Sequence, residues 1–213
     1  PDPEVSAIMD KYTALVEPIK AQVVGQSAET LVKGYPTIAQ TNGDLALGNL
    51  IADGMRVAMD ADIAMMNGGG VRSPLEAGEV TFGDLFAIQP FGNVLNKATL
   101  SGADISVVLN EQITARGLDY HVSGLKYTYT YDDATKTGKV VDIFLPDGSK
   151  IDPEKEYTVV VNNYMYSNIS TSFDELASSM EVGPVDIDAT VDYVKTLPKP
   201  FTYAVEGRIQ RVQ

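Results

Sequence analysis

The first stretch of the chain carries apolar residues at helical spacing. They form one stripe of an amphipathic helix: Val5, Ile8, Met9, Tyr12, Leu15, Val16 and Ile19. Asp2 is suited to cap this helix and Pro3 to start it, whereas Pro18 should end or kink it. A second amphipathic helix is predicted over residues 47–58, with its cap near Asp44.

Short apolar runs separated by turn residues predict strands. These runs occupy residues 22–26, 63–66, 94–99, 125–131, 140–145, 157–163 and 208–212, and helical patterns occupy residues 82–88, 102–111, 172–180 and 186–197. A hairpin loop is expected over residues 132–138. The alternation along residues 125–131 puts Tyr127, Tyr129 and Tyr131 on one sheet face, which we interpret as a packing or edge surface rather than a binding site. This mixture predicts an α+β fold with mixed sheets.

Composition and charge narrow the function classes. The 213 residues suit one large domain or two small ones, and the net charge of −13 argues against nucleic-acid binding and against anionic membrane surfaces. No apolar run approaches the ~20 residues that a membrane span needs. The absence of cysteine excludes disulfides and thiolate metal sites. Because the chain begins at Pro1 rather than methionine, we expect a fragment or a processed product from which any signal peptide has been removed.

A glycine loop stands where the run at residues 63–66 ends. Asn67 is followed by three glycines, Val71 and Arg72. Glycine lets the backbone take positive φ and lie close to a ligand, and the arginine fork suits phosphate or carboxylate. The loop could therefore bind a small anion. By itself it is equally consistent with a tight turn and a surface salt bridge.

Three motifs at fixed spacing give this loop a context. They are GNLIAD at residues 48–53, NGGGVR at 67–72 and QPFGN at 89–93. Together they resemble the C-terminal, substrate-binding domain of the 5'-nucleotidase family, which includes UDP-sugar hydrolases and 2',3'-cyclic-nucleotide phosphodiesterases. The resemblance implies a layered α/β/β/α domain over residues 22–213. It also implies an interdomain linker helix over residues 1–21, although that helix could instead pack on its own domain.

The resemblance assigns roles to the residues of these motifs. Asn67 would face the nucleobase and Arg72 the phosphate, with Gly69 and Gly70 in the substrate-binding loop. Phe91, between a proline and a glycine, would be one half of an aromatic clamp on the base. Without the resemblance, Phe91 would be interpreted as a buried core ring. Tyr164, just after the strand at residues 157–163, fits the other half of the clamp.

Two departures from the family pattern concern the sugar and the phosphate. The family has Gly-Gly-Asp-Gly after the second aromatic residue, and its aspartate holds the ribose hydroxyls. Here Asn168-Ile169-Ser170-Thr171 stands in its place, and Ser170 cannot supply the carboxylate. Gly43 occupies the position of an arginine that helps to hold the phosphate in many members. We therefore expect nucleosides to bind mainly by stacking, with little preference for ribose.

The chemistry of the family requires histidines that this chain lacks. Its two-metal centre lies in a separate N-terminal metallophosphatase domain, and His121 is the single histidine here. We expect His121 on the surface or in a loop, no catalytic residue or metal in this chain, and two divalent metals in the partner domain. The implied function is nucleotide binding for a 5'-nucleotidase-like phosphoesterase outside the cytoplasm: secreted, cell-wall-associated or periplasmic. The alternative is a non-catalytic small-ligand-binding or surface interaction module with a degenerate nucleoside site.

Overall fold

The computed structural model describes residues 2–33, 43–169 and 172–213. Its first element, α1 (Pro3–Lys20), begins as predicted. The Asp2 carboxylate accepts a hydrogen bond of 2.9 Å from the backbone N–H of Glu4, and Pro3 is the first helical residue. Pro18 lies inside the helix, which continues to Lys20. Pro18 therefore does not end the helix, which was one of its two predicted effects; a kink at Pro18 stays a prediction.

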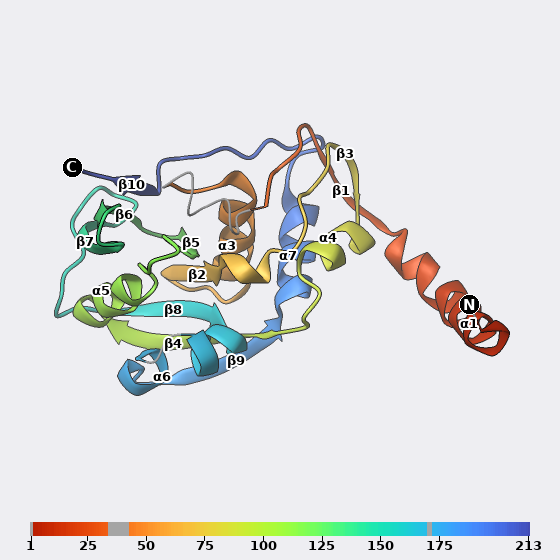
Figure 1. The fold of residues 1–213 in the computed structure, drawn as a ribbon, viewed down its shortest axis with the longest axis horizontal. Coiled ribbons are helices and arrows are strands. Elements are labelled where there is room, and N and C mark those ends of the chain that lie inside the picture. The colour runs from red at the N-terminus through yellow and green to blue at the C-terminus, as the bar shows by residue number, and fades with distance from the viewer. Residues whose placement is uncertain (1, 34–42, 170–171) are drawn as a thin grey trace.

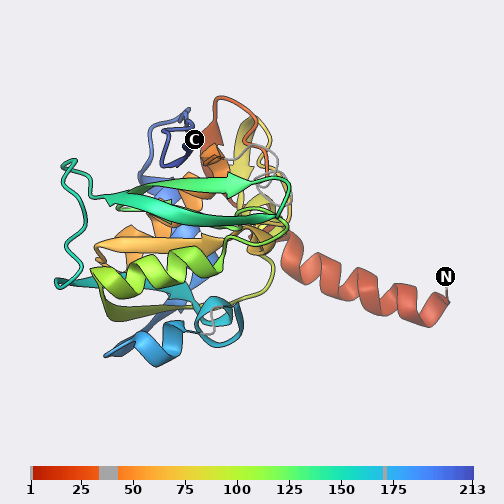
Figure 2. The same cartoon turned by 60° about the vertical axis from the view of Figure 1, so that its left-hand side comes forward.

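Helix α1 extends away from the rest of the molecule (Figures 1 and 2). None of its residues, all of which the structure describes, is buried. The apolar stripe is exposed along its whole length, from Val5 at 53% to Ile19 at 55%. The helix contacts α4 (Phe82–Ile88), but its apolar stripe does not pack against the described part of the domain. Its role as a linker stays a prediction.

The remaining elements alternate along the chain. The strands are β1 (Val23–Ser27), β2 (Ile63–Asn67), β3 (Gly78–Thr81), β4 (Val94–Ser101), β5 (Tyr120–Ser123), β6 (Lys126–Asp132), β7 (Thr137–Phe144), β8 (Glu156–Asn162), β9 (Met180–Val185) and β10 (Ile209–Arg211). The helices are α3 (Ala46–Ala58), α4 (Phe82–Ile88), α5 (Gly102–Glu111), α6 (Phe173–Leu176) and α7 (Asp186–Thr196), with short turns η1 (Gly68–Gly70) and η2 (Met165–Ile169).

Within the described residues, the strands form three sheets. The largest has the order β5-β2-β8-β4-β9, in which β2 and β8 are parallel and the other neighbours antiparallel. A second sheet has the order β10-β6-β7 and is also mixed, and β1 pairs with β3. The predicted α+β fold with mixed sheets is confirmed.

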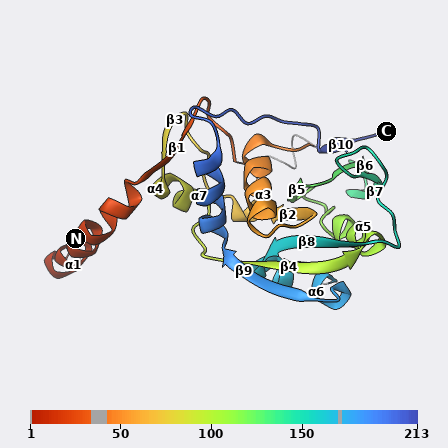
Figure 3. The ribbon, with the colours of Figure 1, turned by 180° about the vertical axis from the view of Figure 1, so that it is seen from behind.

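The five-stranded sheet is covered on both faces along β2, β5 and most of β8, whereas the edge strand β9 is largely exposed. Along β2, Ala64 and Met66 join one cluster of buried apolar side chains, whereas Ile63 and Met65 join another. Helices α3 and α7, which lie side by side in Figure 3, cover the first face. The β6–β7 hairpin and α5 cover the second face (Figure 2). This layering explains why β2 reads as a continuous apolar run.

Three local predictions need correction. Helix α3 has Leu45 as its N-cap without a side-chain hydrogen bond, because the Asp44 carboxylate instead accepts from Asn49 and from the backbone N–H groups of Glu206 and Arg208. The helix predicted over residues 172–180 is only the single turn α6, and Met180 begins strand β9. The hairpin loop is shorter than predicted, because β6 ends at Asp132 and β7 starts at Thr137.

The tyrosine face of β6 is a packing surface, as predicted. Tyr127 and Tyr129 are both 1% exposed and belong to the second cluster. His121, by contrast, is neither on the surface nor in a loop. It is fully buried in β5, and neither ring nitrogen has a hydrogen-bond partner within the described residues. Gly48 makes room for it, since a Cβ there would lie 2.0 Å from the His121 Nδ1.

This burial predicts a pH-dependent stability. Burial lowers the pKa of His121 to about 4, although the carboxylate of Asp44 acts in the opposite direction. The unfolded chain takes up a proton near pH 6.5, which the folded chain does not do until about pH 4. Stability is therefore lost as the pH falls through this window, by roughly 3 kcal/mol.

The measurement is urea unfolding at a series of pH values, for the natural chain and for His121→Met. Methionine is uncharged and fits irregular core space, so the variant should lack this loss. Asp186, whose pKa burial raises to about 6, titrates in both proteins and cancels in the comparison. Parallel stability curves for the two proteins would contradict the prediction.

Candidate functional site

One edge of the five-stranded sheet gathers two of the three motifs, NGGGVR and QPFGN, together with Tyr164. Strands β2 and β8 are parallel, so their carboxyl ends meet there. Strands β4 and β5 run the other way and begin there, with Leu95 opposite Asn162 and Tyr120 opposite Asn67. The loops after β2 and β8 and those before β4 and β5 therefore converge. In open α/β sheets such an edge is where ligands bind.

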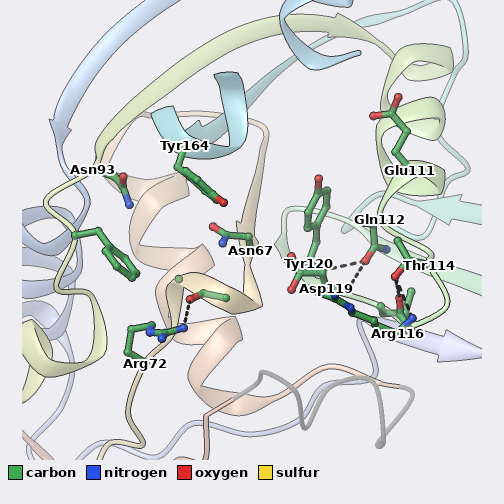
Figure 4. A pocket seen from close by; sticks show the side chains of 15 residues that line it. Asn67, Arg72, Asn93, Glu111, Gln112, Thr114, Arg116, Asp119, Tyr120 and Tyr164 are labelled. Carbon is green, nitrogen blue, oxygen red and sulfur yellow. Dashed lines mark hydrogen bonds between the residues drawn. The ribbon is translucent and has the colours of Figure 1, made fainter. Parts of the chain in front are cut away.

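A pocket of about 730 Å³ opens at this edge (Figure 4). It is lined by Asn67, Gly69, Gly70, Arg72, Phe91, Asn93, Glu111, Gln112, Thr114, Arg116, Gly117, Leu118, Asp119, Tyr120 and Tyr164. Six of the seven residues predicted for the site are among these. The seventh, Ser170, lies outside the described residues. The structure thus brings these six residues together in one pocket, and their roles in binding stay predictions.

The glycine loop is a turn of 3-10 helix, η1, rather than a loop at positive φ. A Cβ on Gly70 would lie 2.5 Å from the Met66 Cε, so a larger residue at this last position would displace the end of the buried Met66 side chain. The turn follows directly on Asn67, which is only 4% exposed. The Asn67 Oδ1 accepts a hydrogen bond of 3.0 Å from the Asn162 Nδ2. This hydrogen bond orients the Asn67 amide group, whose Nδ2 can donate to a ligand.

Two aromatic rings stand exposed in the pocket wall. Phe91 is 58% exposed and Tyr164 is 48% exposed, so the interpretation of Phe91 as a core ring is wrong. Gly92 has φ +63°, a conformation that favours glycine and lets the chain turn directly after the ring. The loops that carry the two rings are tied together, since Asn163 accepts a hydrogen bond of 3.0 Å from the backbone N–H of Val94.

Arg72 is held beside the Phe91 ring. Its Nη1 donates to the carbonyl oxygen of Gly69 at 3.0 Å, and its guanidinium carbon lies 5.7 Å from the centroid of Phe91. Within the part of the chain that the structure describes, Arg72 forms no ion pair. The alternative of a surface salt bridge is therefore not observed there. A cation next to an exposed ring is suited to a ligand that has both a planar group and a negative charge.

The opposite wall, between α5 and β5, was missed from the sequence. Buried Gln112 holds it: its Oε1 accepts from the backbone N–H groups of Asp119 at 2.7 Å and of Tyr120 at 3.0 Å, and its Nε2 donates to the Tyr127 hydroxyl at 2.8 Å. Burial raises the pKa of Asp119, although the backbone N–H groups of the glycine turn partly offset it. The available signal was the short run at residues 120–123, which is a strand.

Among the described residues, no group of three or more histidine, cysteine or acidic side chains could hold a metal ion. None of the helices in the described ranges has the length and apolar character needed to cross a membrane.

Sequence comparisons identify relatives along nearly the whole chain. Endonuclease YhcR of Bacillus subtilis is 46% identical over 214 residues, which cover 99% of this chain and 17% of that protein. Cell wall protein Lmo0130 of Listeria monocytogenes is 29% identical, over 98% of this chain and 29% of that protein. The trifunctional nucleotide phosphoesterase YfkN of B. subtilis is 30% identical, over 99% and 15%. The chain thus spans less than a third of each of these proteins, and their names describe the whole polypeptides.

Comparison with solved structures leads to the same group of proteins as the sequence comparison. The 5'-nucleotidase precursor of Thermus thermophilus superposes with a TM-score of 0.82 at 28% identity, over 97% of this chain and 43% of that one. The family model for the 5'-nucleotidase C-terminal domain matches residues 23–176. This match includes all three motifs and both aromatic residues. The chain belongs to the 5'-nucleotidase C-terminal domain family.

Proposed function

We propose that this domain binds a nucleotide for a 5'-nucleotidase-like phosphoesterase. The observation that carries the proposal is the meeting of two exposed rings, Phe91 and Tyr164, with the guanidinium cation of Arg72 in one pocket. The nucleobase stacks between the rings. Asn67 donates a hydrogen bond to the base, and the guanidinium group of Arg72 binds the phosphate.

In this proposal the hydrolysis takes place on another domain. An N-terminal metallophosphatase domain with two divalent metals activates the water, and the present domain orients the substrate. The relatives that exceed this chain several-fold in length leave room for such a domain. We further propose that the protein works outside the cytoplasm, which a relative named as a cell wall protein supports.

The phosphate contact gives a direct test. Arg72→Gln should weaken the binding of AMP by roughly 10- to 150-fold, because a hydrogen bond to a charged group is worth about 1.5–3 kcal/mol. The binding of adenosine, which has no phosphate, should change little. The measurement is isothermal calorimetry of the 213-residue chain with each ligand.

Arg116→Gln is the matched control, since it removes the same charge from the opposite side of the pocket (Figure 4). It should leave AMP binding nearly unchanged. If Arg116→Gln weakens AMP binding and Arg72→Gln does not, the phosphate lies on the other side of the pocket. If neither ligand binds the natural chain, the proposed function is wrong.

A further inference from the structure

The wall of the pocket that faces the clamp contains a buried hydroxyl without a partner among the described residues. Tyr120 is 1% exposed and lines the pocket, and its hydroxyl forms no hydrogen bond within those residues. In Figure 4 its side chain stands between Asn67 and Glu111. Burying a hydroxyl without a hydrogen-bond partner is unfavourable, so a buried group of this kind needs an explanation. One explanation is that a bound ligand forms the missing hydrogen bond.

Tyr120 is placed directly beside the residue assigned to the base. It is the antiparallel partner of Asn67 in the β2–β5 ladder. Side chains of such a pair lie on the same face of the sheet, with Cβ atoms about 4.5–5.5 Å apart. Gln112 fixes the start of β5 through the backbone N–H of Tyr120, so the position of this side chain is set by buried contacts.

The two side chains differ in what they offer to a ligand. Asn67 offers its Nδ2 as a donor, because its Oδ1 is turned toward Asn162 and accepts from the Asn162 Nδ2. The orientation of Asn162 is itself set, since its Oδ1 accepts from the backbone N–H of Met165. The Tyr120 hydroxyl lies in the negative field of Asp119 and Glu111, and burial together with these two charges raises its pKa, so that it remains protonated. A negative field disfavours a ligand carbonyl beside the hydroxyl and favours an amino group. The wall therefore matches a ring nitrogen acceptor next to an amino donor.

We propose that Tyr120 is a specificity-determining residue, which with Asn67 selects nucleobases that carry an amino group next to an unprotonated ring nitrogen. Adenine and cytosine have this pattern. Hypoxanthine and uracil, their deaminated counterparts, present an N–H donor to Asn67 and a carbonyl oxygen to Tyr120, which reverses it. The inference rests on the proposed function, because it requires the base to be held by Phe91 and Tyr164.

The test compares adenosine with inosine, and cytidine with uridine, by calorimetry. We expect the natural chain to prefer the amino-bearing nucleoside of each pair by about tenfold, since a mismatched donor leaves buried groups unpaired. Tyr120→Phe should reduce this preference to about twofold or less, mainly by weakening adenosine and cytidine. Because the variant removes a buried hydroxyl that lacks a partner in the described chain, its Tm in the absence of ligand should rise by about 2–4 °C.

Tyr157→Phe is the matched control. Tyr157 is also buried, but its hydroxyl accepts a hydrogen bond from the backbone N–H of Asp152. The residue does not line the pocket, so the variant makes the same chemical change outside the site. It should keep the preference and gain no stability. Equal binding of both members of each pair to the natural chain, or a preference that survives in Tyr120→Phe, overturns the inference and leaves the proposed function intact. Absence of binding by all four nucleosides overturns both.

Discussion

Replacing Arg208 by methionine is expected to lower the free energy of unfolding by about 3–5 kcal/mol. The guanidinium group is held by two hydrogen bonds to Asp53, of 2.7 and 2.8 Å, and by one of 2.8 Å to the carbonyl oxygen of Val122. The Arg208 and Asp53 side chains are only 8% and 13% exposed. Removing the arginine would leave a buried carboxylate without its counter-ion.

The structure already shows how strongly this carboxylate is held. Burial acts to raise the pKa of Asp53, but the hydrogen bonds from Arg208, Ser123 and Tyr203 outweigh it, so the pKa is lowered. The pair also connects distant parts of the chain, because Asp53 lies on α3 and Arg208 directly precedes β10. Losing it should therefore destabilise the whole domain.

Urea unfolding measures this effect, and Arg211→Met is its control. Arg211 forms an ion pair of 2.7 Å with Asp133, but the two side chains are 31% and 69% exposed. An exposed pair of this kind is worth about 0–1 kcal/mol. Similar losses of stability for the two variants would show that the buried pair has no special role.

The second large effect concerns the aromatic clamp. Alanine in place of both Phe91 and Tyr164 should abolish measurable adenosine binding, since each stacked ring is worth roughly 1–3 kcal/mol. Either single alanine variant should weaken adenosine by roughly 5- to 150-fold. Calorimetry of each variant gives the measurement.

Two controls separate stacking from other losses. Tyr164→Phe keeps the ring and should bind adenosine nearly as well as the natural chain. Phe86→Ala removes an equally exposed ring, at 47%, from α4 outside the pocket, and should have no effect on binding. Adenosine binding that survives the double alanine variant would mean that the base lies elsewhere.

The elements that the sequence predicted best have strong local signals. Helices α4 and α5 have the predicted bounds, and both begin with capping boxes, formed by Thr81 with Asp84 and by Ser101 with Asp104. Strands β5 and β9 were missed because they owe their conformation to pairing with β2 and β4, which are distant in sequence. Gly183 and Pro184 within β9 further obscured it.

Only half of the pocket could be predicted from the sequence, namely the half formed by residues of the motifs. Phe91, the glycine turn and Arg72 lie in short contiguous motifs, and Tyr164 directly follows a predicted strand. The resemblance to the 5'-nucleotidase family was therefore enough to identify them. The wall formed by residues 111–120 carries no motif, and only the β2–β5 pairing brings Tyr120 beside Asn67. Likewise Asp53 lies in the GNLIAD motif, but its ion pair with Arg208 joins residues 155 positions apart. Local patterns cannot reveal contacts of this range.

The central claim is that a nucleobase stacks between Phe91 and Tyr164. The most direct measurement is NMR of the 213-residue chain with adenosine, recording nuclear Overhauser effects between the adenine protons and assigned side chains. The account predicts contacts from adenine to the rings of both residues, together with shifts of the Asn67 amide resonances. Adenine contacts confined to other side chains, or a spectrum unchanged at saturating adenosine, would contradict it.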